Sequence, residues 1–370
     1  MTKTIHTLST LLLVFAMSCG SDSDVNKSEA NISRFKGTQS PGDVWDWELN
    51  HDENTFSTVW DYGTFDDETD DITIEGTFTT LGSGYLKATI TQVTPPNAEI
   101  PADGTAWFYA MQLPNVAMIV KPEGSIKGDM ISTVAAGDCA DVAGDYNYIM
   151  IAPGNGEAFD PATEEAYGVA TFIEESNGFS IHGDKYSLDC ANGGPCTVDT
   201  GITGLPTAEC IENGTVSISS DDNATLVKGQ FTGAGVMMLD LGFGNGGVLA
   251  AKRNSTFTQA DLDNEEFIGF AYLPANNNDK TVPVNLTWSN DGTGIGKAMT
   301  NITTGELAAD GVTFEITGIT NGLANGTLTH SDLTVTTFVA AMIESEGSKI
   351  MIGSSYDQDG NAFILVLVKK

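Results

Sequence analysis

The pattern that most constrains the fold of this 370-residue chain is an alternation of apolar and polar side chains, interrupted at short intervals by glycine, asparagine and aspartate. Residues 45–49 (Trp-Asp-Trp-Glu-Leu) and 72–78 (Ile-Thr-Ile-Glu-Gly-Thr-Phe) show the period of two that a half-buried strand requires. The interrupting clusters return roughly every 8 to 12 residues, a spacing typical of short antiparallel strands. Many of the 41 glycines occupy these turn positions, and convincing amphipathic helices are absent. The sequence therefore predicts an all-β chain.

One unit of strand, glycine-centred turn and strand occurs three times in the chain. Its copies occupy residues 76–86, 170–181 and 286–295, with Gly-Ser-Gly, Asn-Gly and Asp-Gly at their turns. Glycine and asparagine tolerate the positive φ angles that a tight hairpin turn requires. The repetition indicates that the chain consists of related, hairpin-rich modules.

The boundaries of these modules follow from further landmarks. Entry segments lie at residues 42–45, 140–146 and 260–267, late apolar strands at 116–119, 236–239 and 340–343, and closing apolar strands with a basic pair at 248–253 and 364–370. Successive copies are roughly 105 to 120 residues apart. We therefore predict three modules, at residues 42–138, 139–255 and 256–370.

A module of this length can bury a core of its own, which a short solenoid repeat cannot. Six to eight short antiparallel strands joined as a meander would close into a small barrel or a sandwich, because closure removes exposed strand edges. The alternative is a β-propeller, whose blades repeat about every 40 to 50 residues. No period in that range is present, so barrels or sandwiches are the predicted architecture.

The entry segment of the second module resembles the opening of calycin-type barrels, the group of lipocalins and avidins. Residues 140–146 (Ala-Asp-Val-Ala-Gly-Asp-Tyr) lead from a turn into glycine, any residue and an aromatic residue. The resemblance implies a closed β-barrel in which the aromatic residue after the glycine, here Tyr146, plugs one end.

The start of the chain has the features of a secretory signal. Lys3 provides a weakly basic head, residues 8–17 form a short apolar core, and small residues precede Cys19. The ending Ala-Met-Ser-Cys at residues 16–19 resembles the lipobox of bacterial lipoproteins. That resemblance implies cleavage after residue 18 and an acylated Cys19 that attaches the chain to the lipid bilayer. The alternative is an ordinary signal peptide with an incidental Cys19.

The segment after the signal peptide, residues 19–41, is rich in Ser, Asp, Asn, Lys and Gly and has almost nothing to bury. We predict a flexible tether here, which holds the folded part away from the membrane. Gly20 stands where an aspartate would suggest retention in the inner membrane of some bacteria. The predicted location is therefore the outer membrane, facing the periplasm or the cell surface.

Charge and hydropathy limit the classes of partner. The chain has 50 acidic and 16 basic residues, a net charge of −34. Such a surface repels nucleic acid and anionic lipid headgroups, which argues against both as partners. After the signal, no apolar run approaches the length of a membrane-spanning helix.

Four cysteines remain if Cys19 carries lipid. They are Cys139, Cys190, Cys196 and Cys210, an even number in an oxidising compartment. Their spacing does not match the short paired intervals of a structural zinc site. We expect disulfides and favour Cys190–Cys196 with Cys139–Cys210 around it, although two other pairings are open.

Metal binding has two weak candidates. Asp357, Asp359 and Asn361 alternate as in the first half of a calcium loop, with a glycine between the last two. No bidentate glutamate follows, and an Asp-Gly hairpin turn explains the same residues. The acidic run at 66–71 is a second calcium candidate, with a solvated loop as its alternative.

No set of catalytic residues converges in this sequence. His51, His182 and His330 fall in different modules, and no nucleophile elbow, phosphate loop or zinc-protease motif is present. We therefore predict no catalysis and no cofactor.

The function predicted first is a membrane-anchored binding or surface-interaction protein whose partner is an unknown protein or glycan. The second hypothesis is a carrier that holds a small apolar ligand in a barrel cavity; the strands near residues 236–239 and 338–343, rich in Met and Ala, could line it or simply fill the core. An enzyme acting on extracellular polymers is the third hypothesis. A hollow barrel would favour the carrier, and an exposed apolar patch would favour surface interaction.

Overall fold

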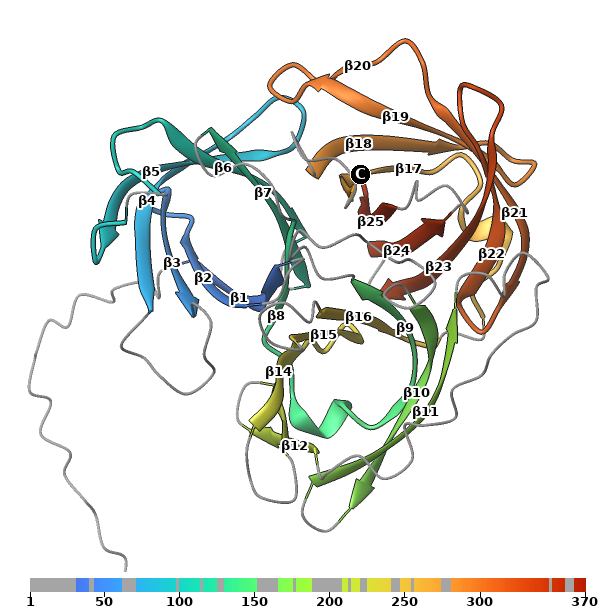
Figure 1. The fold of residues 1–370 in the computed structure, drawn as a ribbon, viewed down its shortest axis with the longest axis horizontal. Coiled ribbons are helices and arrows are strands. Elements are labelled where there is room, and N and C mark those ends of the chain that lie inside the picture. Colours follow the sequence, from blue (N-terminus) through green and yellow to red (C-terminus); the bar gives the residue numbers. More distant parts are fainter. Residues whose placement is uncertain are drawn as a thin grey trace, which may run out of the picture. The chain divides into compact units, whose positions relative to one another are not determined.

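The computed structural model describes residues 31–39, 43–61, 71–97, 100–113, 116–124, 130–151, 166–175, 178–187, 208–211, 214–219, 225–240, 247–253, 256–273, 281–345, 348–356 and 363–370. The strands form three closed antiparallel barrels, and these are blue to teal, green to yellow, and orange to red along the sequence (Figure 1). No helix in these residues is long and apolar enough to cross a membrane. The all-β prediction and the barrel alternative are confirmed, and the propeller alternative is wrong.

Barrel 1 is a meander in which each strand pairs with the next and the last pairs with the first. Its strands are β1 (Ile32–Gln39), β2 (Val44–Asn50), β3 (Thr55–Asp61), β4 (Ile72–Thr80), β5 (Leu86–Thr94), β6 (Ala106–Leu113), β7 (Ala117–Gly124) and β8 (Ile131–Ala135). The alternation read from the sequence is visible in β2, where Trp45, Trp47 and Leu49 are buried and face the barrel interior.

Barrel 2 has the same order and closes between its last and first strands. Its strands are β9 (Gly144–Ile151), β10 (Ala166–Glu175), β11 (Gly178–Ser187), β12 (Ala208–Ile211), β13 (Thr215–Ser219), β14 (Thr225–Phe231), β15 (Val236–Asp240) and β16 (Gly247–Lys252). A short 3-10 helix at Cys139–Asp141 precedes β9. Tyr146 is fully buried in the interior cluster of this barrel and makes edge contacts with Phe172 and Phe231; its role as a plug at one end stays a prediction.

Barrel 3 closes through pairing of β17 with β25 and of β18 with β19. Its strands are β17 (Glu266–Tyr272), β18 (Thr281–Trp288), β19 (Thr293–Asn301), β21 (Val312–Thr320), β22 (Leu323–Thr329), β23 (Val335–Ser345), β24 (Ser348–Tyr356) and β25 (Phe363–Lys369). The two-residue β20 (Glu306–Leu307) pairs with β19 only. A 3-10 helix at Gln259–Asp261 precedes β17, as its counterpart precedes β9.

The three predicted strand–turn–strand units are hairpins in the structure. They are β4–β5, β10–β11 and β18–β19. Gly84, Gly178 and Gly292 have φ angles of 94°, 128° and 81° at their turns. These values lie in the region that glycine adopts without steric penalty, which is the reason for glycine at each turn.

The predicted tether is wrong at its C-terminal end, because β1 (Ile32–Gln39) lies within residues 19–41. This strand has few large apolar side chains, yet Phe35, Thr38 and Gln39 are buried because the strand pairs with both β2 and β8. The entry segment proposed at residues 42–45 consequently leads into the second strand of its barrel, whereas the other two lead into the first. The first hairpin copy joins the fourth and fifth strands of its barrel, whereas the other two join the second and third, so the three copies do not occupy equivalent positions.

Each barrel interior holds its own hydrophobic cluster. Barrel 1 is filled mainly by aromatic rings, with Phe108 in edge contact with both Trp45 and Trp47 at centroid distances of 6.1 and 5.1 Å. Barrel 3 contains Trp288, Phe314 and several aliphatic side chains. Each barrel therefore buries enough apolar surface to form a core of its own.

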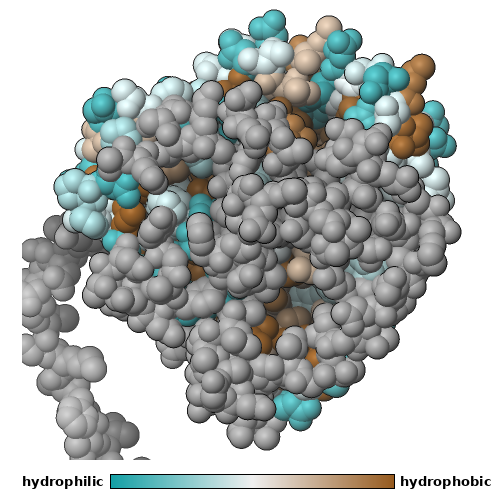
Figure 2. Space-filling view, viewed as in Figure 1, coloured by the Kyte–Doolittle hydropathy of each residue, from teal (hydrophilic) through white to brown (hydrophobic). Residues whose placement is uncertain are grey.

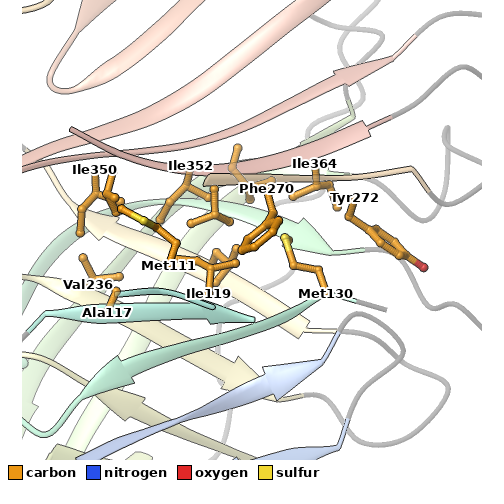
Figure 3. Packing of buried hydrophobic residues seen from close by; sticks show 14 of the residues in the cluster. Met111, Ala117, Ile119, Met130, Val236, Phe270, Tyr272, Ile350, Ile352 and Ile364 are labelled. Carbon is orange, nitrogen blue, oxygen red and sulfur yellow. The ribbon is translucent and has the colours of Figure 1, made fainter. Parts of the chain in front are cut away.

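A further cluster packs outer faces of strands from all three barrels against one another. Figure 3 shows Met111 and Ile119 of barrel 1 beside Phe270 and Ile352 of barrel 3, with Val236 of barrel 2 nearby. The predicted late apolar strands contribute to this shared core through β7, β15 and β23, and the predicted closing strands contribute through β16 and β25. Their apolar runs are continuous because one face lines a barrel and the other lines the shared core.

Candidate ligand pocket in the third barrel

An apolar pocket of about 290 Å³ lies in barrel 3. Its inner wall includes Leu286 of β18, Phe314 of β21 and Leu367 of β25, all of which face the barrel interior. Nearer the strand ends the wall passes to smaller or partly exposed residues, among them Ala271 and Ala298. The volume is close to the lower limit of small-molecule sites, and a mostly apolar lining is typical of them.

One side of the pocket consists of the neighbouring strands β25, β17 and β18. Ala271 pairs with Leu365 on one side and with Val282 on the other, so three inward-facing apolar residues form a row across these strands. Leu273 and Phe363 extend the same apolar wall. The period of two places every second residue of these strands inside the barrel, and the sequence has an apolar residue at each of these positions.

The adjoining side consists of β19, which pairs with β18, the start of β21 and the turn after β22, and it includes several polar residues. Lys297, Asp310, His330 and Ser331 all contribute to the lining. The ammonium group of Lys297 donates to the main-chain carbonyl of Ala309 at 3.3 Å. The pocket therefore has an apolar wall and, next to it, a side with several polar residues, which we call the polar wall.

A larger depression of about 960 Å³ crosses β1, β2 and β3 of barrel 1 and reaches β13 and β14 of barrel 2. Its charged side chains pair with each other: Arg34 with Glu48 at 2.9 Å, and Lys36 with Asp46 at 3.0 Å. Because its surface is broad and its charges are paired, we place the candidate site in barrel 3.

The structure describes one of the two predicted disulfides. Cys139 and Cys210 form a disulfide with an S–S distance of 2.10 Å, which joins the 3-10 helix before barrel 2 to β12. Cys190 and Cys196 lie outside the described residues, as does Cys19. The expected disulfide between the outer two cysteines is therefore present, and the inner pair and the lipid attachment stay predictions.

The calcium candidates Asp357, Asp359 and Asn361 also lie outside the described residues, and so does the acidic run except for Asp71. Within the part of the chain that the structure describes, no group of three or more His, Cys, Asp or Glu side chains could hold a metal ion. Calcium binding stays a prediction for the two loops that carry these residues.

The three histidines belong to three different barrels. His51 follows β2 and shares a hydrogen bond of 3.0 Å with Ser33, His182 is exposed on β11, and His330 follows β22. Of the three, His330 lines the pocket. Its place at the pocket could not be predicted from the sequence, because a single histidine in a turn carries no signal of a cavity.

The pocket residues themselves were missed by sequence reasoning. The strands rich in Met and Ala, considered as a possible cavity lining, instead fill cores: Met238 and Ala341 lie in the shared cluster, and Met237 and Met342 lie in the interiors of barrels 2 and 3. The sequence signal that could have located the pocket is a set of small inward-facing residues, Gly296, Ala298 and Ala271. The interior of barrel 1 has large aromatic residues instead.

No protein-family model matches this chain, and no curated protein matches it. Among solved structures, it is similar to a Transferrin Binding Protein B (TbpB) variant from Haemophilus parasuis, with 10% identity and a TM-score of 0.28 over 89% of this chain and 66% of the other. It is also similar to TbpB from Neisseria meningitidis, with 12% identity and a TM-score of 0.26 over 89% of this chain and 65% of the other. The chain thus spans about two thirds of their length, and likeness at these TM-scores assigns no function.

Proposed function

We propose that this protein is an exported lipoprotein, attached to the outer membrane of a bacterium through an acylated Cys19, and that it acts by binding and not by catalysis. We further propose that barrel 3 takes up a small apolar ligand. The observation that supports binding is the 290 Å³ pocket with its apolar wall of inward-facing side chains. Of the hypotheses drawn from the sequence, the carrier is the one that requires such a cavity.

The composition of the pocket favours binding over catalysis. A catalytic site needs several reactive polar groups that converge on one position, whereas the inner wall here is Leu286, Phe314, Leu365 and Leu367. Such a wall stabilises a ligand by removing apolar surface from water. It offers no nucleophile or general base to the buried part of the ligand.

The size of the pocket sets the size of the ligand and its expected affinity. A volume of 290 Å³ has room for roughly ten non-hydrogen atoms, at about 30 Å³ for each water-sized group. Burial of roughly ten methylene groups contributes about 8 kcal/mol, from which about 4 kcal/mol or more is lost in association. The dissociation constant should therefore be about 1 mM or weaker.

The binding proposal is tested with a naphthylamine probe whose fluorescence rises in an apolar environment. The wild-type protein should give a saturable rise, and Ala271→Phe should abolish it because the new ring fills the pocket. Ala298→Phe, at an exposed position of the same lining, gives a second test with less risk to folding. Ala102→Phe, in an exposed turn of barrel 1, is the matched control and should bind the probe as the wild type does. Equal binding by all four proteins would overturn the proposal.

The anchoring proposal is tested in bacteria grown with labelled palmitate. The wild-type chain should take up the label and sediment with outer-membrane fractions. A Cys19→Ser variant should do neither, because two or more acyl chains are what gives stable attachment. Label that persists in Cys19→Ser, or a wild-type chain that is released as a soluble protein, would contradict lipid attachment at this residue.

Surface interaction remains a second candidate function, and a feature of barrel 3 favours it. Hydrophobic residues lie among hydrophilic ones over its strands in the space-filling view (Figure 2). Ile295, Thr313, Thr329 and Val335 stand opposite one another on β19, β21, β22 and β23, and the two aliphatic residues are 52% and 58% exposed. A protein partner could bury this row. Cross-linking on intact cells should then give a product that an Ile295→Asp, Val335→Asp double variant loses while it still binds the probe.

A further inference from the structure

The two walls of the barrel 3 pocket differ in what they can offer a ligand. The wall from β25, β17 and β18 presents Leu365, Ala271 and Val282 in one row across the strands. The wall from β19 and β21 and from the turn after β22 includes His330 and Ser331. A wholly apolar ligand would leave the polar wall without hydrogen-bond partners from the ligand, which is unfavourable where water is displaced.

His330 is the polar group with the most extensive support. Its Nε2 lies 3.3 Å from the hydroxyl of Thr336, and that hydroxyl lies 2.7 Å from the hydroxyl of Ser355. Thr336 and Ser355 are 3% and 0% exposed, so this chain of hydrogen-bonding groups runs from the pocket wall into the barrel. The main-chain N–H of His330 donates to the carbonyl of Thr334 at 2.8 Å, which holds the turn. The imidazole is thereby positioned at the pocket by both its ring and its backbone.

The charges near this wall do not favour an anion. Asp310 brings one negative charge to the lining, whereas Lys297 alternates with the inward-facing Gly296 and its ammonium group donates to the carbonyl of Ala309. Asp332, two residues from His330, is a further acidic group, and its main contacts are with the N–H and hydroxyl groups of Thr334, which lower the pKa of its carboxyl. With a net charge of −34 on the whole chain, neither the local nor the long-range field favours an anion here.

We propose that the ligand of barrel 3 is an uncharged amphiphile. It has an apolar body, such as an alkyl chain, that lies against the wall of Leu365, Ala271 and Val282. It also has one neutral hydrogen-bonding head group, such as a hydroxyl or an amide, that meets the wall of His330 and Ser331. This inference rests on the proposed function of barrel 3 as a binding site and adds the chemical class of the ligand.

Displacement of the naphthylamine probe by three ligands of similar length tests the inference: octan-1-ol, octanoate and nonane. Octanol should bind His330→Phe about 2- to 13-fold more weakly than it binds the wild type, the equivalent of one hydrogen bond of about 0.5–1.5 kcal/mol. Nonane should bind both proteins equally or bind the variant more tightly. Since the ratio between proteins is compared for each ligand, differences in water solubility cancel.

Lys297→Met separates a neutral head group from an anionic one. Octanol affinity should stay within about twofold of the wild type in this variant, and octanoate should bind the wild type more weakly than octanol does. Octanoate that binds the wild type more tightly than octanol, and that Lys297→Met weakens, would overturn the inference. Should His330→Phe fail to fold, Ser331→Ala at an exposed turn position allows the same comparison of octanol with nonane.

The outcomes distinguish this inference from the proposal on which it rests. If the probe binds and octanol and nonane respond alike to His330→Phe and Ser331→Ala, the head-group inference is wrong and the apolar site stands. If the probe does not bind the wild-type protein saturably, the proposed function itself is wrong, and the inference falls with it.

Discussion

The hydroxyl of Tyr85, in the β4–β5 turn of barrel 1, donates a hydrogen bond of 2.7 Å to the main-chain carbonyl of Gly269 in β17 of barrel 3. The ring is fully buried and makes an edge contact with Phe270 at 5.2 Å between centroids. Ser83 in the same turn donates to the carbonyl of Ile302. The turn with the repeated glycine pattern is therefore also one of the parts of barrel 1 that contact barrel 3.

Tyr85→Phe removes the hydrogen bond and keeps the ring. We expect the free energy of unfolding to fall by about 0.5–1.5 kcal/mol, and Tyr85→Ala to lower it by about 3–5 kcal/mol because a large side chain leaves a cavity. Urea unfolding followed by tryptophan fluorescence measures both changes. Tyr109→Phe, at a partly buried tyrosine on the same shared core, is the control and should have a smaller effect. Equal losses for Tyr85→Phe and the control would contradict the role of the Gly269 contact.

The stability of the fold should decrease at alkaline pH. Burial raises the pKa of Tyr85 and of Tyr146, because the phenolate is poorly solvated inside the protein. Below about pH 10, the ordinary tyrosine pKa, the folded and unfolded chains both keep these protons, so the two tyrosines contribute fully to the free energy of unfolding. Above about pH 10 the unfolded chain loses these tyrosine protons before the folded chain does. The free energy of unfolding therefore falls as pH rises, by at most about 1.4 kcal/mol per pH unit for each group.

Urea midpoints measured between pH 8 and pH 11.5 test this dependence. Tyr85→Phe and Tyr146→Phe should each make the alkaline decline shallower, since each variant removes one of the two protons involved. A decline that neither buried variant alters would show that other groups cause it.

The Cys139–Cys210 disulfide spans 71 residues and should stabilise barrel 2 by restricting the unfolded chain. Replacing both cysteines with serine should lower the free energy of unfolding by about 2–4 kcal/mol. A variant with Cys190 and Cys196 replaced by serine keeps the long-range bridge and serves as the comparison. Peptide mapping of the oxidised protein should recover residues 139 and 210 in one cross-linked species. Alkylation of both as free thiols would contradict the pairing.

Leu333 has a φ angle of 72° and is 81% exposed in the turn between β22 and β23. A branched side chain in the left-handed region is unfavourable by roughly 1–2 kcal/mol, and burial does not compensate for it here. Leu333→Asn should therefore raise the free energy of unfolding by about 0.5–1 kcal/mol. Leu307→Asn, at an exposed leucine with ordinary backbone angles, should give no such gain. A thermal unfolding series that ranks the two variants alike would remove backbone strain as the explanation.

How far the sequence predicts the fold depends on the strand in question. β2 was identified because Trp45, Trp47 and Leu49 alternate with polar residues, and the same alternation marks β4. β1 was not identified, since its burial comes from pairing with β2 and β8 and not from large apolar side chains. Missing this one strand moved the first module boundary and placed the first entry segment one strand too late.

A barrel cavity could be predicted from the sequence as a kind of site, but its location in the chain could not. The alternation in β17 and β18 indicates that Ala271 and Val282 face the same interior, but it does not say how much of that interior other side chains fill. Filling depends on residues that are distant in sequence, such as Phe314 on β21 and Leu367 on β25, which only barrel closure brings to one wall. The polar wall is likewise formed by closure, since Lys297 and His330 belong to different strands and turns.

The alternating strands, their glycine turns and the number of modules could be read from the sequence, because a period of two and a positive φ angle are local properties of a few residues; β1, which lacks the alternation, could not. Only the tertiary structure decided what covers the second face of the continuous apolar strands. Ile119, Met238 and Val366 would each fit a barrel interior by composition, yet they lie in the core shared by the three barrels. The hydrophobic effect has no direction, so an apolar residue specifies that it is buried and leaves the choice of partner to the packing of the whole chain.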